Sequence, residues 1–177
     1  GTALALQLGH RNSIDIDLFS QSSFDNSSVT EHLTQKFDLR IDAEMHNTLL
    51  THINNIKVDF ICHAYPFVKD PITEEGITYL SQEDIAAMKL NAIAGSGQRL
   101  KDFIDVYFLL ESLSVNEMLE CYTIKYPNSN PLIALKAISY FNDIDPEIDP
   151  PLMKHPLPLN TIQNRITEAV LHPYKTF

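Results

Sequence analysis

The strongest chemical signal in the sequence is a pair of aspartates, Asp15 and Asp17, near the start of the chain. Apolar and acidic residues alternate from Ile14 to Leu18, which is the pattern of a β-strand. Residues i and i+2 of a strand share a face at about 7 Å spacing, and two carboxylates that close repel each other unless a cation separates them. The pair therefore predicts a divalent metal site for Mg²⁺ (or Mn²⁺). Taken alone, the motif also fits an edge strand with an acidic, solvated face.

A third carboxylate, Asp59, lies in the middle of a predicted strand that runs from Ile56 to Cys62. Apolar residues flank Asp59, and we expect the strand to be central in its sheet. A buried carboxylate is costly unless a cation or hydrogen bonds satisfy it. Two interpretations follow: Asp59 completes the metal site, or it forms a salt bridge with a nearby lysine or arginine.

Residues that could bind phosphate precede the aspartate pair. Gly1 and Thr2 open a run of good helix formers, and Gly9 supplies a helix stop. The Thr2 hydroxyl is predicted to cap this helix. The amides of a helix's first turn bind phosphate well, so this segment is a candidate phosphate site.

A second group of charged residues lies on two predicted helices. Ser81 caps the first, which is expected to end near residue 94 and carries Lys89. A Gly-Ser-Gly break follows, and the next helix, predicted over 99–113, carries Asp102 and Asp105 on one face. Periodicity alone is equally consistent with Lys89 as a solvated lysine that covers apolar surface with its stem.

These motifs, in this order, resemble the polymerase-beta-like nucleotidyltransferases and, more closely, the nucleotidyl transferase AbiEii/AbiGii toxin family. Members of that family carry Gly-Gly-Thr-Ala-Leu-Ala-Leu, then Gly-His-Arg, then Ser-x-Asp-apolar-Asp-Leu-Phe. A later block reads Met-Lys-Leu, Ala-Ile and Lys-Asp-Phe-Ile-Asp. The corresponding residues here are 1–6, 9–11, 13–19, 88–90, 92–93 and 101–105.

The sequence departs from the family pattern at two places. The first glycine of the Gly-Gly pair is absent because the chain begins at Gly1, so the phosphate-binding segment is expected to be N-terminally incomplete. Ser96 stands where an arginine often precedes the turn glycine, and Arg99 is the expected substitute.

The resemblance implies a nucleotidyltransferase that moves a nucleoside monophosphate from an NTP to an acceptor hydroxyl and releases pyrophosphate. Two magnesium ions would be held by the aspartates, with Asp59 also acting as base or orienting the nucleophile. Lys89 would contact the triphosphate, Asp105 is preferred over Asp102 as the aspartate that faces the site, and Asp102 would cap its helix or pair with Arg99. The implied catalytic and metal residues are Asp15, Asp17 and Asp59, and the implied substrate-binding residues are Gly1, Thr2, Arg11, Ser13, Lys89, Arg99, Asp102 and Asp105.

Family resemblance also implies a toxin of a toxin–antitoxin or abortive phage infection system, with a cognate antitoxin and with tRNA or a protein as the acceptor. Two alternatives remain open from the residues. One is a catalytically weak binding protein on the same scaffold, and the other is a metal-dependent phosphoester hydrolase that uses the same carboxylates with water as nucleophile.

Composition and pattern predict an α+β protein. The 177 residues are 44% hydrophobic with a net charge of −10, which argues against a surface broadly adapted to nucleic acid. We expect a nucleotidyltransferase core over 1–80, with a mixed or mostly antiparallel sheet, and a C-terminal helical region over 81–177 that completes the site. Two well-separated cysteines, Cys62 and Cys121, indicate reduced thiols of a cytoplasmic protein, and no apolar run is long enough to cross a membrane.

Overall fold

The computed structural model describes residues 1–177 and confirms the α+β class. Two compact units are present: a sheet unit (Gly1–Thr2 and Ser13–Tyr65) and a helical unit (Ala3–Asn12 and Pro66–Phe177). Residues 3–12 and 66–80 thus belong to the helical unit. In chain order the elements are α1 (Thr2–Leu8), β1 (Ile16–Ser20), α2 (Asn26–Thr34), β2 (Leu39–Met45), β3 (Thr48–Ile53), β4 (Ile56–Cys62), β5 (Ile72–Glu74), β6 (Ile77–Tyr79), α3 (Gln82–Gly95), α4 (Leu100–Leu109), α5 (Val115–Lys125), α6 (Pro131–Ile138) and α7 (Leu159–Leu171).

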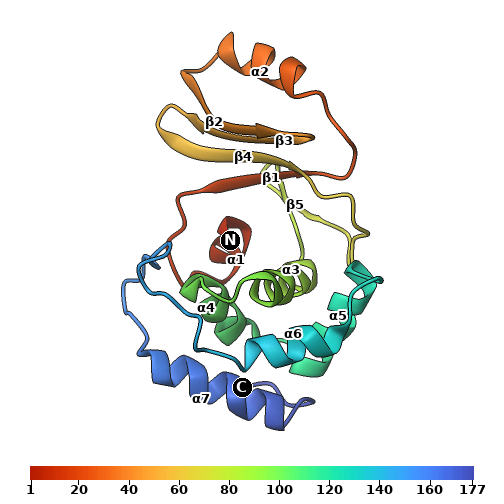
Figure 1. Ribbon diagram of the computed structural model, residues 1–177, viewed down its shortest axis with the longest axis vertical. Helices are drawn as coiled ribbons and strands as arrows, with labels where there is room; N and C mark the ends of the chain where they lie inside the picture. The colour runs from red at the N-terminus through yellow and green to blue at the C-terminus, as the bar shows by residue number, and fades with distance from the viewer. The chain divides into compact units, whose positions relative to one another are not determined.

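The sheet unit contains a four-stranded mixed sheet in the order β1-β4-β3-β2 (Figure 1). β4 is central, as predicted, and pairs in parallel with β1 and antiparallel with β3. Asn54 and Asn55 join β3 to β4 with φ of 50° and 66°, so both residues of the turn are left-handed. This is the two-residue hairpin that the Asn-Asn pair predicts, because asparagine tolerates positive φ.

Alternation along the strands separates the two faces of this sheet. Leu49, Thr51 and Val58 are buried, and Thr51 is the cross-strand partner of Val58, so these residues share one face. Asp59 lies on the opposite face, across from Leu50 of β3. Asp59 and its register partner Asp17 in β1 therefore belong to the face that does not carry the apolar centre of the sheet unit.

Helix α2 begins directly after its cap. The polar run Asn26-Ser27-Ser28 predicts a cap at those residues, but the N-cap is Asp25, which accepts a hydrogen bond from the Ser28 amide. Asn26 instead turns its side-chain amide to the carbonyl oxygens of Met45 and Thr48, at 2.8 and 3.2 Å. That contact ties α2 to the hairpin between β2 and β3.

The segment before α3 contains a hairpin that the sequence did not predict. β5 and β6 pair through Glu75 and Gly76, whose φ values are 49° and 81°. The turn residues of 65–76 predict a loop there, and the sequence predicts a strand only over 77–80. The left-handed glutamate hid the turn, because non-glycine residues adopt this conformation uncommonly.

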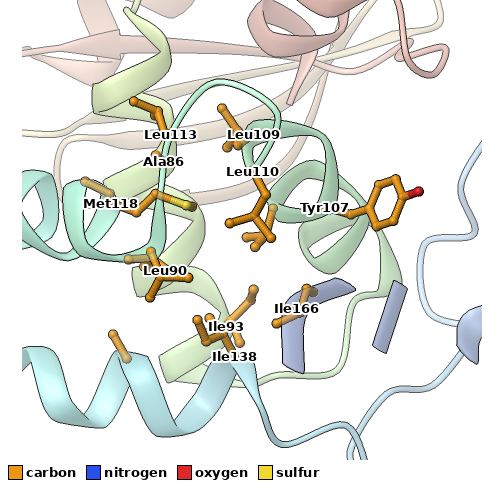
Figure 2. Packing of buried hydrophobic residues seen from close by; sticks show 14 of the residues in the cluster. Ala86, Leu90, Ile93, Tyr107, Leu109, Leu110, Leu113, Met118, Ile138 and Ile166 are labelled. Carbon is orange, nitrogen blue, oxygen red and sulfur yellow. The ribbon is translucent and has the colours of Figure 1, made fainter. Parts of the chain in front are cut away.

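The helical unit is built around one apolar core, part of which is shown in Figure 2. Helices α3 and α4 supply its centre, and α5, α6 and α7 close it. Helix α4 ends at Leu109 rather than near residue 113 as expected. The residues labelled in the figure are Ala86, Leu90, Ile93, Tyr107, Leu109, Leu110, Leu113, Met118, Ile138 and Ile166.

Most helix starts in this unit follow the sequence signals. Ser81 accepts from the Asp84 amide, Ser114 forms a capping box with Glu117, and Asn130 caps α6 with proline at its first position. The last helix differs: Asn160 and Thr161 are the cap signal in the sequence, but the N-cap is Pro158, which has no side-chain cap. No helix in the structure has the length and apolar character needed to cross a membrane.

Both cysteines are free thiols, as predicted. Cys62 is half-buried and Cys121 is buried. Burial, together with the charges of Glu83 and Asp84, raises the pKa of the Cys121 thiol to about 11. Cys121 is therefore an unreactive core thiol near neutral pH.

A buried ion pair joins α3 to α5. The Lys125 ammonium lies 2.7 Å from Asp84, and the two side chains are 1% and 0% exposed. Asp84 also accepts hydrogen bonds from the Val68 and Lys69 amides and from the Ser81 hydroxyl. This network fixes the segment that leads into the first helix of the core.

Replacing Lys125 with Met is expected to destabilise the protein by about 3–5 kcal/mol, because it leaves the Asp84 carboxylate buried without its cation. The measurement is denaturant unfolding followed by circular dichroism. Glu111→Gln is the matched control, since Glu111 pairs with Arg165 at the surface and should cost less than about 1 kcal/mol. Equal losses for the two variants would contradict this account.

Candidate functional site

The sheet unit brings two of the three predicted metal ligands side by side. Asp17 lies in β1 and is the register partner of Asp59 in the parallel neighbour β4. Register partners on adjacent strands present their side chains to the same face, next to each other. Asp15 is the residue immediately before β1 rather than part of the strand, which corrects the strand predicted from Ile14.

Asp59 is buried and only partly satisfied. The residue is 5% exposed, and its Oδ2 lies 3.3 Å from the Lys57 ammonium. Its Oδ1 is buried with no hydrogen-bond partner. The salt bridge expected for Asp59 is therefore present at one oxygen. The other oxygen lacks the partner that a buried carboxylate oxygen requires, so it is available to a metal ion.

The donor set suits a hard divalent cation. Mg²⁺ and Mn²⁺ prefer carboxylate oxygens, and the unpartnered Oδ1 of Asp59 is an oxygen whose burial a cation would offset. As the side chains stand, no group of three or more His, Cys, Asp or Glu is arranged to hold a metal ion. Asp17 and Asp59 thus fit such an ion in chemistry and register, and Asp15 precedes Asp17 by two residues.

The predicted phosphate-binding segment is organised differently from the expectation. Thr2 is the first residue of α1, and its hydroxyl donates to the carbonyl oxygen of Asp15 instead of capping the helix. Because that bond uses the only hydroxyl proton of Thr2, the Ser13 hydroxyl donates to the Thr2 oxygen, at 2.9 Å. Thr2 and Ser13 therefore fix the backbone that leads into Asp15. The predicted cap was wrong, and substrate contacts of Gly1, Thr2 and Ser13 stay predictions.

In the helical unit a second cluster forms around Lys89. Its ammonium lies 2.7 Å from Asp102 Oδ1 and 2.7 Å from Asp105 Oδ2. Lys89 is 8% exposed, so the solvated lysine that periodicity allowed is not what the structure shows. Asp102 also pairs with Arg99 at 2.9 Å, which is one of the two roles expected for it.

Asp105 is the centre of this cluster. Arg11 donates to both of its oxygens, from Nε at 2.7 Å and from a terminal nitrogen at 3.0 Å. His10 Nε2 lies 2.8 Å from Oδ1, so the proton of that imidazole nitrogen points to the carboxylate. His10 Nδ1 is buried without a hydrogen-bond partner. Asp105 thus holds residues of the α1–β1 connection and of α3 together from its place on α4.

The electrostatics follow from these contacts. Burial opposes ionisation of Asp105, but the hydrogen bond from His10 and the charges of Lys89 and Arg11 outweigh it and hold the pKa of Asp105 well below its usual range. Burial likewise lowers the pKa of Lys89, and the charges of Asp105 and Asp102 outweigh that and raise it. Asp105 and Lys89 are therefore both charged near neutral pH.

A simple count shows an excess of positive charge in this cluster. Arg11, Lys89 and Arg99 contribute three positive charges and the two aspartates contribute two negative ones, which leaves one net positive charge from these five side chains. Arg99 is the accessible cation, since its side chain is 45% exposed whereas that of Lys89 is 10% exposed. An anionic ligand would meet Arg99 first.

Two contributors to these clusters were missed by reasoning from the sequence. His10 stood out only as part of the Gly-His-Arg motif, and Lys57 only as a neighbour of Asp59. The Lys-x-Asp spacing on a strand was the available signal for Lys57, because residues two apart share a face. His10 had no local signal, since its partner Asp105 lies 95 positions away.

Comparison with known proteins defines the class. The fold resembles a protein from H. pylori described as a nucleotidyltransferase (TM-score 0.62, 16% identity, covering 98% of this chain and 84% of that one) and JHP933 from Helicobacter pylori (TM-score 0.59, 16% identity, 98% and 81%). The sequence is 32% identical over 154 residues to the uncharacterized protein aq_aa25 of Aquifex aeolicus strain VF5, covering 84% of this chain and 74% of the relative. Residues 1–168 match the nucleotidyl transferase AbiEii toxins of type IV toxin–antitoxin systems.

The fold is therefore that of nucleotidyltransferases. The chain belongs to the AbiEii nucleotidyl transferase toxin family, as its motifs predicted. Membership of a type IV toxin–antitoxin family implies a cognate antitoxin.

Lys89→Met is expected to lower the free energy of unfolding by about 3–5 kcal/mol, because two buried carboxylates lose the ammonium they share. Chemical denaturation measures the change. Lys36→Met is the control, since Lys36 is exposed just after α2 and its ammonium contacts His32 at the surface. A loss below about 1 kcal/mol for Lys89→Met would show that the cluster does not stabilise the fold.

The buried Asp105 should also give the protein a specific acid sensitivity. Its folded pKa is depressed below the unfolded value of about 3.9, so its contribution is fully present above about pH 5 and is lost as pH falls below about 4. The free-energy difference between wild type and Asp105→Asn should therefore be constant from about pH 8 to about pH 5 and shrink below about pH 4. Unfolding curves at each pH measure it, and a difference that grows on acidification would contradict the assignment.

Proposed function

We propose that this protein is a metal-dependent nucleotidyltransferase that moves a nucleoside monophosphate from an NTP to an acceptor hydroxyl and releases pyrophosphate. The observation that carries the proposal is Asp59: a carboxylate on the central strand, in register with Asp17, with one buried oxygen that has no partner. Acidic residues without a functional role on a sheet face would instead be exposed to solvent, unlike Asp59. Family membership and the nucleotidyltransferase fold support the same reaction class.

In this proposal Asp15, Asp17 and Asp59 hold two Mg²⁺ (or Mn²⁺) ions. When bound, the ions would stabilise the negative charge that develops on the attacking and leaving oxygens. The bonds of Thr2 to Ser13 and to the Asp15 carbonyl keep the Asp15 backbone in place beside β1. Asp59 is also the candidate to accept the proton of the attacking hydroxyl or to orient that hydroxyl.

The cluster in the helical unit supplies the proposed phosphate contacts. Its single excess positive charge and the exposed Arg99 favour an anionic ligand such as a triphosphate. Lys89 would contribute as a compact charge whose direction is set by Asp102 and Asp105. Arg11 donates to both oxygens of Asp105 and to the Asn12 carbonyl oxygen, so its role in this proposal is to hold that carboxylate rather than to touch phosphate.

The acceptor is proposed to be a hydroxyl of tRNA or of a protein, which the family resemblance implies. The net charge of −10 means that any contact with a polyanion must be local, because a general electrostatic footprint is absent from the composition. A protein hydroxyl is the other acceptor to test.

The direct test is incubation of the protein with each labelled NTP, Mg²⁺ and total tRNA or total protein. We expect label transfer that EDTA abolishes and that Asp59→Asn lowers by about a hundredfold or more, because the substitution removes an anionic ligand at the buried position. The double variant Asp15→Ala/Asp17→Ala should be inactive. Asp38→Asn, an exposed aspartate of the same unit, is the matched control and should retain wild-type activity.

Each of the other outcomes would assign a different function to this protein. Metal-dependent release of nucleotide without label on any acceptor would replace transfer by phosphoester hydrolysis. Absence of turnover for all four NTPs with every acceptor would leave a binding protein on a nucleotidyltransferase scaffold and would overturn the proposal. Transfer that is unchanged in Asp59→Asn would remove Asp59 from the site.

A further inference from the structure

Lys57 is the cation that faces the carboxylates of the sheet unit. It precedes Asp59 by two positions on β4, and its ammonium lies 3.3 Å from Asp59 Oδ2. This is the one ion pair that Asp59 makes, and the other oxygen of Asp59 has no partner. The Lys57 side chain is 45% exposed, so its end is in contact with solvent as well as with the carboxylate.

The ammonium is influenced by more than Asp59. Besides the charge of Asp59, the charges of Asp15 and Asp17 act on the Lys57 ammonium. The three carboxylates proposed to hold metal therefore share one nearby positive charge.

We propose that Lys57 is an internal counterion that competes with the divalent cation for Asp59. The proposal rests on the proposed function, because it requires the three carboxylates to be the metal ligands. In the absence of metal, Lys57 offsets the repulsion among the carboxylates. When the cation binds, its positive charges repel the ammonium, and the half-exposed lysine withdraws into solvent on its flexible stem.

Two opposite effects of removing Lys57 follow from this competition. Like charges a few ångströms apart repel each other more strongly near a protein surface than in bulk water, so a lysine beside a divalent ion weakens the binding of that ion markedly. Loss of the lysine should therefore tighten cation binding. It should also destabilise the protein without metal, because the carboxylates then lack any counterion. A lysine that only braced the sheet would not tighten metal binding when removed.

The test measures Mn²⁺ binding to the full chain by electron paramagnetic resonance of free Mn²⁺, together with thermal unfolding in EDTA and in excess Mn²⁺. We expect Lys57→Met to bind Mn²⁺ about tenfold or more tightly than wild type. Its melting temperature should fall by about 2–4 °C in EDTA, and Mn²⁺ should raise it by more than in wild type. Lys57→Arg retains the charge and should resemble wild type, and Lys36→Met controls for loss of an exposed lysine of the same unit.

The outcomes separate the counterion from the metal site itself. If wild type binds Mn²⁺, Asp59→Asn does not, and Lys57→Met binds as wild type or more weakly, the counterion proposal is wrong while the metal site stands. If wild type binds no Mn²⁺, or Asp59→Asn binds as well as wild type, the metal assignment fails and the counterion proposal fails with it. Binding is read from ligand titration and needs no turnover, so a preparation without transferase activity still tests the counterion.

Discussion

Ionised carboxylates held away from water dominate the organisation of this protein. Removing a charge from solvent costs several kcal/mol unless a partner of opposite sign is fixed beside it, so each buried aspartate dictates where cations must lie. Asp84 fixes Lys125 of α5, and Asp105 fixes Arg11 and Lys89. The bonds to Lys125 and Arg11 join segments that are 41 and 94 positions apart in the chain. Buried ion pairs therefore fix the positions of the helices around the core, in addition to the apolar packing between them.

Local rules were sufficient for much of the fold. The alternation from Ile56 to Cys62 predicted β4 with its observed bounds, and Asn54 with Asn55 predicted the turn before it, because both signals depend on neighbours in sequence. The capping box of α5 likewise follows from the spacing of Ser114 and Glu117 in the sequence. Where a local signal was ambiguous, the sequence predicted the wrong structure. The cap of α2 lies one residue earlier than its polar run indicates, and the hairpin closed by Glu75 was predicted to be a loop.

The partners of charged side chains could not be predicted in the same way. Periodicity placed Lys89 on α3, but its two carboxylates come from another helix, so sequence alone left it equally acceptable as a solvated lysine. Asp102 and Asp105 were expected to share a face of their helix. The structure confirms this, since both carboxylates contact the Lys89 ammonium. Which cations would neutralise them depended on how α1 and α3 pack against α4, and that packing is a property of the whole core.

The contrast between Asp105 and Asp59 separates a carboxylate with a structural role from one that is available for chemistry. Both are nearly inaccessible, at 0% and 5% exposure. Asp105 has partners for both oxygens, and its surplus of donors leaves nothing for a ligand to supply. Asp59 has a single lysine at the edge of hydrogen-bonding distance and one oxygen without a partner. Folding can satisfy a buried carboxylate completely, as Asp105 shows within the same chain, so an incompletely satisfied one on a central strand is best explained by a ligand that arrives after folding.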